Sequence, residues 1–247
     1  RDVAPSRGLG DVYKRQHLFR SDALDVLGFN YHEQYLEPFL RNFPGRKLIV
    51  SESTSALMTR GYYEMPSDHI YIRPESWDKP FEAPEHVCSS YDNCHVPWGS
   101  THEKTWHLVK TLPHVSGLFV WTGFDYLGEP TPYWWPSRSS FFGIVDLAGF
   151  PKDVYYMYKS EWTDEPVLHI FPHWNWKEGE RVDIWAYYNN ADEVELYLNG
   201  KSLGVRQKTD STYHVSWRVP FTPGTLRAVS RLGGKEVLGK EIHTAGE

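Results

Sequence analysis

Three short apolar runs in the first two thirds of the sequence end in residues that could do chemistry. These residues are Asn30 and Tyr31 after run 25–29, Ser51 and Glu52 after run 47–50, and Trp121 at the end of run 117–121. A carboxylate that directly follows a buried strand is held on a rigid element, where it can serve as a nucleophile or a base. The alternative for Glu52 is an ordinary solvent-facing glutamate at a strand end.

Helical patterns separate these runs and follow the last of them. The segments 32–43, 101–112 and 151–162 predict helices, with Thr101 or Ser100 as the N-cap of the second and Pro151 at the start of the third. Fully apolar strands that alternate with helices are typical of a parallel sheet covered by helices. A doubly wound sheet and a (β/α)8 barrel both fit. Because catalytic groups in a barrel lie at the carboxyl ends of its strands, the chemistry-bearing strand ends favour a TIM barrel.

The sequence changes character after residue 166. Seven short strand-like runs follow one another, at 167–172, 182–188, 194–199, 202–207, 213–220, 225–232 and 236–245. The pairs Asn199-Gly200 and Gly233-Gly234 are strong signals for two-residue hairpins. This pattern predicts an immunoglobulin-like β-sandwich over 166–247, which follows an α/β part over 17–162. Residues 1–16 show neither the periodicity of a helix nor that of a strand, and we expect them to be a non-native leader.

Composition excludes some classes of protein. The net charge of the 247 residues is −6, which argues against a nucleic-acid partner. No apolar run approaches the roughly 20 residues of a membrane-spanning helix. The two cysteines, Cys88 and Cys94, are compatible with a small disulfide-closed loop or with two thiols.

Several separated motifs resemble glycoside hydrolase family 2, in particular its β-galactosidase-like members. They are KLIVSESTSAL (47–57), GLFVWTGFDYLGEPTPYWWPSRSSFFGIVDLAGFPKD (117–153) and GFNYHEQYL (28–36), with EVELYLNGKSLG (193–204) and VPFTPGTLRAV (219–229) in the appended sandwich. The resemblance implies strands six to eight of a TIM barrel followed by an immunoglobulin-like β-sandwich. It also implies a retaining, exo-acting β-glycoside hydrolase that cleaves β-galactosides in oligo- or polysaccharides by double displacement.

The resemblance assigns roles to individual residues. Glu52 matches the catalytic nucleophile, and the hydroxyl of Tyr31 is expected to hydrogen-bond it. Asn30 contacts sugar or shapes the turn, and Trp121 forms the floor or wall of the sugar subsite. Each aromatic residue has an alternative role in the core, where a satisfied hydroxyl or a packed indole is common.

Three further candidates lie after the third apolar run. Asp125 and Glu129 could bind sugar hydroxyls or tie down their loop, and the two alternatives stay open. Trp134, with its neighbour Trp135, could line outer subsites or serve the structure alone.

One part of the chemistry is missing from the sequence. The family acid/base is a glutamate that follows an asparagine in an earlier barrel strand, and neither Glu33, Asp125 nor Glu129 stands in such a pair. We therefore expect the 247 residues alone to have little or no hydrolase activity. No cofactor or metal site is expected in this segment, although a divalent metal and a homo-oligomer are compatible with a full-length enzyme.

Alternatives stay open for the sugar that is cleaved and for the class of protein. A β-glucuronidase of the family carries an Asn-x-Lys pair, which the segment SRSSFFG (137–143) lacks, although Arg138 could meet an acid. A β-mannosidase is a further alternative. A different class is a non-catalytic carbohydrate-binding protein, with Trp174 and Trp176 as its platform. Family habit points to the periplasm or the cell surface.

Overall fold

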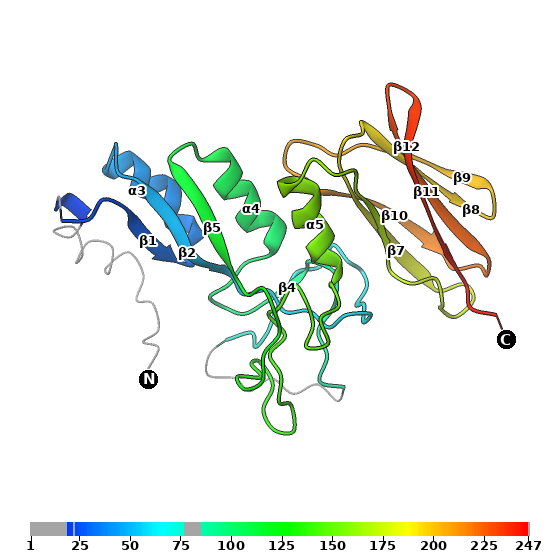
Figure 1. Ribbon diagram of the computed structural model, residues 1–247. Helices are drawn as coiled ribbons and strands as arrows, with labels where there is room; N and C mark the ends of the chain where they lie inside the picture. Colours follow the sequence, from blue (N-terminus) through cyan, green and yellow to red (C-terminus); the bar gives the residue numbers. More distant parts are fainter. Residues whose placement is uncertain (1–18, 22, 77–84, 247) are drawn as a thin grey trace.

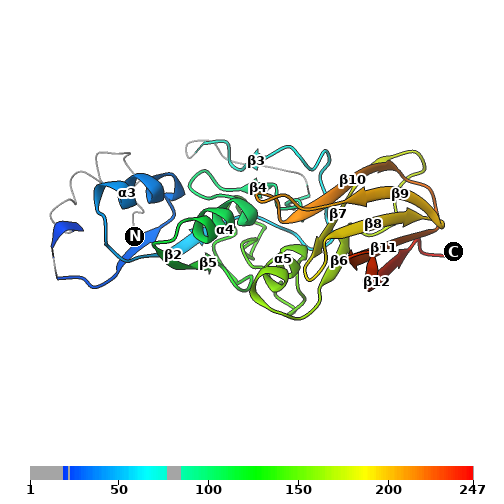
Figure 2. The ribbon, with the colours of Figure 1, turned by 90° about the horizontal axis from the view of Figure 1, so that it is seen from above.

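The computed structural model describes residues 19–21, 23–76 and 85–246. A small parallel sheet with its helices lies at one end of the molecule, and a set of antiparallel strands lies at the other (Figures 1 and 2). The leader predicted at residues 1–16 lies outside the described residues. No helix in the described ranges is long and apolar enough to cross a membrane.

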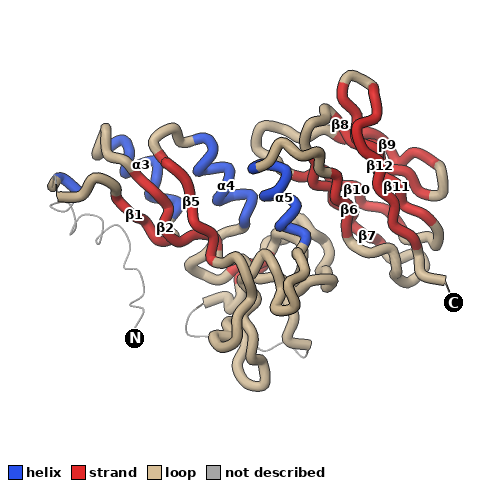
Figure 3. The backbone as a smooth tube through the Cα atoms, viewed as in Figure 1, coloured by secondary structure: helices blue, strands red, loops and turns tan. Residues whose placement is uncertain are grey.

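The three apolar runs form one parallel sheet, as the sequence predicts. Strands β1 (Leu27–Asn30), β2 (Leu48–Thr54) and β5 (Val115–Trp121) pair in the order β1-β2-β5. Strand β2 runs four residues beyond the predicted end at residue 50, so Glu52 lies inside the strand. Figure 3 shows that the loops gather beyond the carboxyl ends of these strands.

Helices cover one face of this sheet. The 3-10 turn η1 (Glu33–Tyr35), helix α3 (Leu36–Asn42) and helix α4 (His102–Thr111) connect the strands. The buried side chains of Leu48 and Val50 on β2 belong to the same apolar cluster as Phe39 on α3 and Val109 on α4. Burial of such residues is the main force that holds a helix on a sheet.

The start of α4 combines a predicted and an unpredicted cap. The hydroxyl of Thr101 accepts a hydrogen bond from the backbone N–H of Lys104 at 3.4 Å, as an N-cap residue does. The carboxylate of Asp92 accepts from the N–H groups of His102 and Glu103 at 2.8 and 2.7 Å. Asp92 comes from the irregular segment before the helix, so these two bonds attach that segment to α4.

Between β2 and α4, the described residues 55–76 and 85–101 are mostly irregular, as predicted. The short strands β3 (Tyr71–Ile72) and β4 (Cys94–His95) among them pair in parallel. Cys88 and Cys94 are both buried free thiols, so the disulfide alternative is not the state of this structure. They pack with Leu57 and Tyr133 in one apolar cluster.

Helix α5 and seven strands make up the rest of the chain. The elements are α5 (Asp153–Trp162), β6 (Leu168–Phe171), β7 (Arg181–Tyr188), β8 (Glu193–Leu198), β9 (Lys201–Arg206), β10 (His214–Pro220), β11 (Thr225–Leu232) and β12 (Lys235–His243). The strands form two sheets, in the orders β10-β7-β6 and β12-β11-β8-β9. Residues from both sheets share one core, which includes Ile184, Leu196, Trp217 and Ala228.

Both predicted hairpin turns are present. Asn199 and Gly200 join β8 to β9 with φ values of 50° and 79°, and Gly233 and Gly234 join β11 to β12 with 56° and 78°. Positive φ at both central residues is what a type I′ turn requires. These turns help to fix the register of the antiparallel pairs β8–β9 and β11–β12.

The structure contradicts the proposed sugar-binding platform of the sandwich. Trp174 is fully inaccessible, packs edge-on against Phe221 and donates its indole N–H to the carbonyl of Thr222 at 3.0 Å. Trp176 is partly buried and stacks on His173. The alternating polar and aromatic sequence HWNW suggests exposure, whereas the first tryptophan fills the sandwich core.

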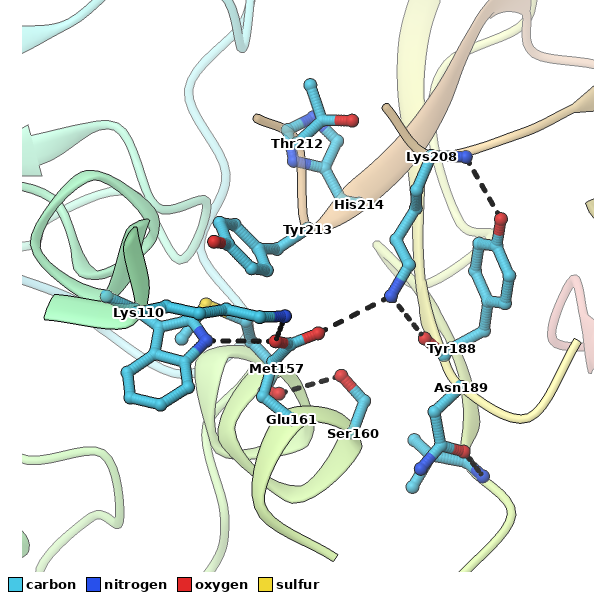
Figure 4. A network of polar contacts seen from close by, with 12 residues as sticks. Lys110, Met157, Ser160, Glu161, Tyr188, Asn189, Lys208, Thr212, Tyr213 and His214 are labelled. Atoms are coloured by element: carbon cyan, nitrogen blue, oxygen red, sulfur yellow. Dashed lines mark hydrogen bonds and ion pairs between the residues drawn. The ribbon is translucent and has the colours of Figure 1, made fainter. Parts of the chain in front are cut away.

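A polar network joins the two parts of the molecule (Figure 4). The carboxylate of Glu161 on α5 accepts from the indole of Trp106 at 2.9 Å and from the ammonium of Lys110 at 2.7 Å, both on α4. Lys208, between β9 and β10, lies 3.6 Å from the other oxygen of Glu161 and donates to the carbonyl of Tyr188 at 2.8 Å. Charges on α4, α5 and the antiparallel part thus meet at one carboxylate.

Candidate active site

An irregularity in β2 sets the position of Glu52. In the pairing with β1, Phe29 lies opposite Val50 and Asn30 lies opposite Glu52, so β2 contains one extra residue. The pairing with β5 has the same excess between Val50 and Ser53. A bulge of this kind breaks the alternation of side chains and re-aims the residues after it. The side chain of Glu52 therefore does not follow those of Leu48 and Val50 onto the same buried face of the sheet.

The side chains around the bulge hold the Glu52 carboxylate. The amide of Asn30 donates to Oε2 of Glu52 at 3.4 Å, which is a long contact. The hydroxyl of Ser51 donates to Oδ1 of Asn30 at 2.8 Å, and this bond fixes which end of the amide faces Glu52. The predicted pair at the ends of two adjacent strands is therefore together in space.

Tyr31 approaches Glu52 from the end of β1. Its backbone N–H donates to the carbonyl of Glu52 at 2.6 Å, and its hydroxyl lies 2.7 Å from Oγ of Ser55. Burial raises the pKa of Tyr31 well above its usual range, and the carboxylate of Glu52 raises it further by hydrogen bonding and charge. Tyr31 is therefore a neutral hydroxyl that can donate to the carboxylate at any working pH.

Trp121 ends β5 beside a second tyrosine. The rings of Trp121 and Tyr126 meet edge to face at 5.9 Å between centroids, and the hydroxyl of Tyr126 donates to Oε2 of Glu129 at 3.1 Å. Burial raises the pKa of Tyr126 to about 12, and the charges of Glu129 and Glu52 contribute in the same direction. Glu129 is exposed, which leaves its carboxylate open to a ligand.

For Asp125 the structure shows the loop-tying alternative. Its carboxylate accepts from the backbone N–H of Gly143 at 2.8 Å and pairs with the buried ammonium of Lys152 at 2.7 Å. Lys152 also donates to the carbonyl of Met58 at 2.7 Å. These bonds join the loop after β5 to the start of α5 and to the segment after β2. A contact of Asp125 with sugar stays a prediction.

The loop after β5 presents its tryptophans to solvent. Trp134 and Trp135 are 72% and 75% exposed, and the guanidinium of Arg138 lies over the ring of Trp135 at 4.8 Å. Within this loop, Leu127 and Ser139 pair in an isolated antiparallel β-bridge. Trp134 is thus available to a ligand, and its part in binding stays a prediction.

The structure adds residues that the sequence patterns did not single out. Ser55 hydrogen-bonds the Tyr31 hydroxyl, the indole of Trp98 lowers the pKa of Tyr31, and Tyr126 packs on Trp121. Ser55 stands inside the quoted motif SESTSAL, which was the one available signal for it. Trp98 lies in an irregular segment with no pattern. Glu33, the nearest other carboxyl in sequence to Tyr31, is buried and accepts from Thr105 at 3.1 Å.

A metal is not needed to explain these contacts. Within residues 19–21, 23–76 and 85–246, no group of three or more histidine, cysteine, aspartate or glutamate side chains could hold a metal ion. The site instead consists of a carboxylate with an amide donor, a phenol donor and aromatic walls. Such a set can bind a polyhydroxylated ligand and can place one carboxylate against an electrophilic carbon.

Known proteins resemble this chain over nearly all its length. The protein named β-galactosidase BoGH2A of Bacteroides ovatus is 59% identical over 240 residues, which cover 97% of this chain and 28% of that protein. A protein named putative β-glucuronidase of Formosa agariphila is 34% identical over 280 residues, which cover 99% of this chain and 26% of that protein. A family model described as a domain of unknown function, DUF4982, matches residues 179–238.

Solved structures of glycosidases also resemble this chain. The crystal structure of a β-glycosidase from Bacteroides vulgatus matches with a TM-score of 0.80 and 30% identity, over 100% of this chain and 36% of that one. A glycosyl hydrolase family 2 member from Bacteroides cellulosilyticus matches with a TM-score of 0.61 and 27% identity, over 91% of this chain and 26% of that one. The chain thus spans about a quarter to a third of these proteins, and it belongs to glycoside hydrolase family 2.

Proposed function

We propose that the protein containing this segment is a retaining, exo-acting β-galactosidase in which Glu52 is the catalytic nucleophile. The observation that carries the proposal is the Glu52 carboxylate at the β2 bulge, next to the amide of Asn30 and the hydroxyl of Tyr31. Donors beside a carboxylate orient it, which is what a nucleophile needs.

The reaction would proceed by double displacement. Retaining glycosidases use two carboxyl groups roughly 5–5.5 Å apart, one as the nucleophile and the other as acid and then base. Glu52 attacks the anomeric carbon while the acid protonates the departing oxygen, and water then releases the sugar. We propose that the acid/base lies in the rest of the protein, so that the 247 residues alone have little or no activity.

The proposed scaffold is a (β/α)8 barrel. Strands β1, β2 and β5 would be its sixth, seventh and eighth strands, and β6 to β12 would form an immunoglobulin-like sandwich after it. The parallel order β1-β2-β5 and the candidate residues at the carboxyl ends support this assignment. Asn30, Trp121 and Glu129 would bind the sugar at this end, and the exposed Trp134 would contact the part of the substrate beyond the cleaved bond.

The charges near the site favour a neutral sugar. A uronate would need a free cation, but Lys152 is buried and neutralised by Asp125. Arg138 lies over Trp135 at the exposed part of the loop. The name of the relative that is 59% identical supports a β-galactoside, whereas the names of several less similar relatives keep a β-glucuronide as the alternative.

The test uses the full-length protein and an activated 2-deoxy-2-fluoro-β-galactoside. Fluorine slows the release of the sugar, so the covalent intermediate accumulates and its peptide can be identified by mass. A label on Glu52 is the expected result. A label on another carboxylate would contradict the assignment of the nucleophile. Labelling only by the corresponding fluoro-glucuronide would keep the mechanism and change the sugar.

A further inference from the structure

We infer that Ser55 is a positioning residue of the active site, which turns the hydroxyl proton of Tyr31 toward Glu52. This inference rests on the proposed role of Glu52 as the nucleophile. Its basis is the hydrogen bond of 2.7 Å between the hydroxyl oxygens of Tyr31 and Ser55, made by a serine that is 1% exposed. Ser55 does not touch the reacting atoms and acts through Tyr31.

The carboxylate of Glu52 determines which of Tyr31 and Ser55 donates in the hydrogen bond between them. A phenol has one proton, and an ionised carboxylate can only accept. We place the single proton of Tyr31 toward Glu52, because the carboxylate of Glu52 raises the pKa of this phenol, as an acceptor does. Between Tyr31 and Ser55 the serine must then be the donor, with its proton on the phenol oxygen. The result is a one-way relay from Ser55 through Tyr31 to Glu52.

The indole of Trp98 supports the same direction. It lowers the pKa of Tyr31, which is the effect of a donor on a phenol oxygen, and an indole N–H can only donate. The phenol oxygen is therefore surrounded by two donors, Ser55 and Trp98, which occupy its acceptor positions. Rotation of the Tyr31 proton away from Glu52 would place it against a donor hydrogen. The arrangement thus selects one rotamer of the hydroxyl.

The backbone holds Ser55 in a conformation that serine rarely adopts. Thr54 and Ser55 have φ values of 73° and 53°, in the left-handed region. The carbonyl of Thr54 accepts from the N–H of Ser100 at 2.7 Å, and that of Ser55 accepts from Val96 at 3.3 Å. Gly99 packs against this turn so closely that an added Cβ would lie 2.3 Å from the carbonyl oxygen of Thr54.

Such a backbone is expected where geometry serves function. Residues in sparsely populated conformations persist only where their surroundings determine them, and they gather at functional sites. Here the strained pair stands at the end of the strand that carries Glu52, because Thr54 is its last residue and Ser55 follows. The turn returns the serine hydroxyl to the side on which Tyr31 meets the carboxylate. A fixed Tyr31 proton would stabilise Glu52 before attack and again when the carboxylate departs from the sugar.

The experiment measures the pH dependence of β-galactoside hydrolysis by the full-length protein and its Ser55→Ala variant. Without the serine donor, the Tyr31 proton is free to turn away, and the ionised form of the carboxylate loses a hydrogen bond. The acidic limb of kcat/KM should therefore move to higher pH. At the optimum we expect kcat to fall about three- to tenfold with little change in KM.

Two further variants separate the hydroxyl from the backbone. Ser55→Gly also lacks the hydroxyl but tolerates the positive φ, so it should show the same shift of the acidic limb. Ser53→Ala removes another buried hydroxyl from the same strand, one that donates to the carbonyl of Phe119 at 2.9 Å, and should leave the limb in place. In a Tyr31→Phe background, Ser55→Ala should have no additional effect on the limb.

The outcomes are distinct. A limb that is unchanged in both Ser55 variants, or a shift in Ser55→Ala that Ser55→Gly reverses, would overturn the role of the hydroxyl. A Ser53→Ala variant that shifts the limb equally would have the same consequence. A wild-type protein that hydrolyses no β-glycoside would overturn the proposed function and this inference with it.

Discussion

Asn30 lies directly opposite Glu52 across β1 and β2, one residue out of step with the pair that precedes it. Phe29 faces Val50, and the extra residue in β2 brings Glu52, not Ser51, beside Asn30. The Asn30 amide points its donor at the carboxylate because Ser51 occupies its oxygen. The nucleophile candidate and its amide donor are therefore aligned by a bulge in the middle of regular parallel pairing.

Replacement of Asn30 by aspartate should weaken the site through charge. Asn30→Asp keeps the size and the acceptor for Ser51 but replaces the amide donor with a second carboxylate. A like charge disfavours ionisation of Glu52, so the acidic limb of kcat/KM should move to higher pH. We expect kcat/KM at neutral pH to fall about 10- to 100-fold in the full-length protein. Ser53→Ala is the control, because its hydroxyl donates to the carbonyl of Phe119 and the variant leaves the Asn30 amide and its bond from Ser51 in place. A limb that stays in place in Asn30→Asp would contradict the contact.

Asp125 should contribute more to stability than to substrate binding. In Asp125→Asn the buried ammonium of Lys152 loses its counter-charge. Breaking a buried pair from one side costs about 3–5 kcal/mol. Denaturant unfolding followed by fluorescence should show this loss in the free energy of unfolding, and the double variant Asp125→Asn/Lys152→Met should recover part of it. A variant of unchanged stability with a strongly raised KM would instead favour contact with the sugar.

Glu161 should stabilise the joint between the two parts in a pH-dependent way. Although burial raises its pKa, the hydrogen bonds from Lys110 and Trp106 outweigh burial and hold the pKa below its usual range. Glu161→Gln should lower the free energy of unfolding by about 1–3 kcal/mol at neutral pH. Because the folded-state pKa is depressed, this difference is present above the unfolded pKa and disappears as the pH falls through the folded pKa.

A neighbouring glutamate provides the control for Glu161. Glu165 pairs with Lys159 at 2.7 Å, but its side chain is 71% exposed. An exposed pair contributes little, so Glu165→Gln should leave the free energy of unfolding nearly unchanged. Both substitutions are measured by denaturation in the same buffers. Equal effects would show that the network in Figure 4 contributes no more to the free energy of unfolding than an exposed ion pair does.

Asp92 should make the protein less stable as the pH rises toward neutrality. Burial raises its pKa to about 7, and Glu103 adds to this, while the N–H groups of Glu103 and His102 act in the opposite direction. A raised folded pKa contributes stability below the unfolded value near 4, which is lost as the pH rises through about 7. The free energy of unfolding of wild type minus that of Asp92→Asn should therefore fall between pH 4 and 8.

The difference between these two proteins isolates Asp92. Burial lowers the pKa of His102 to about 3, which gives the opposite slope at acid pH, but His102 titrates in both proteins. A difference that is flat over this range would mean that Asp92 stays ionised at the start of α4.

Much of the architecture follows from local pattern. Apolar runs predicted the three parallel strands, and Thr101 predicted the start of α4. The pairs Asn199-Gly200 and Gly233-Gly234 predicted the turns of two hairpins. These features depend on residues close together in the chain, so a sequence contains their full cause.

The residues of the candidate site were predictable from the sequence in part, and most of the contacts between them were not. The motifs at 28–36, 47–57 and 117–153 predicted Tyr31, Glu52 and Trp121 as site residues, because residue types at strand ends are visible in a sequence. The extra residue in β2, the bond from Ser55 to Tyr31 and the pairing of Asp125 with Lys152 were not predictable. The burial of Trp174 contradicted its prediction for a related reason. Each of these depends on partners brought together only by tertiary packing, which decides the register, the direction of a hydroxyl and the neutralisation of a charge.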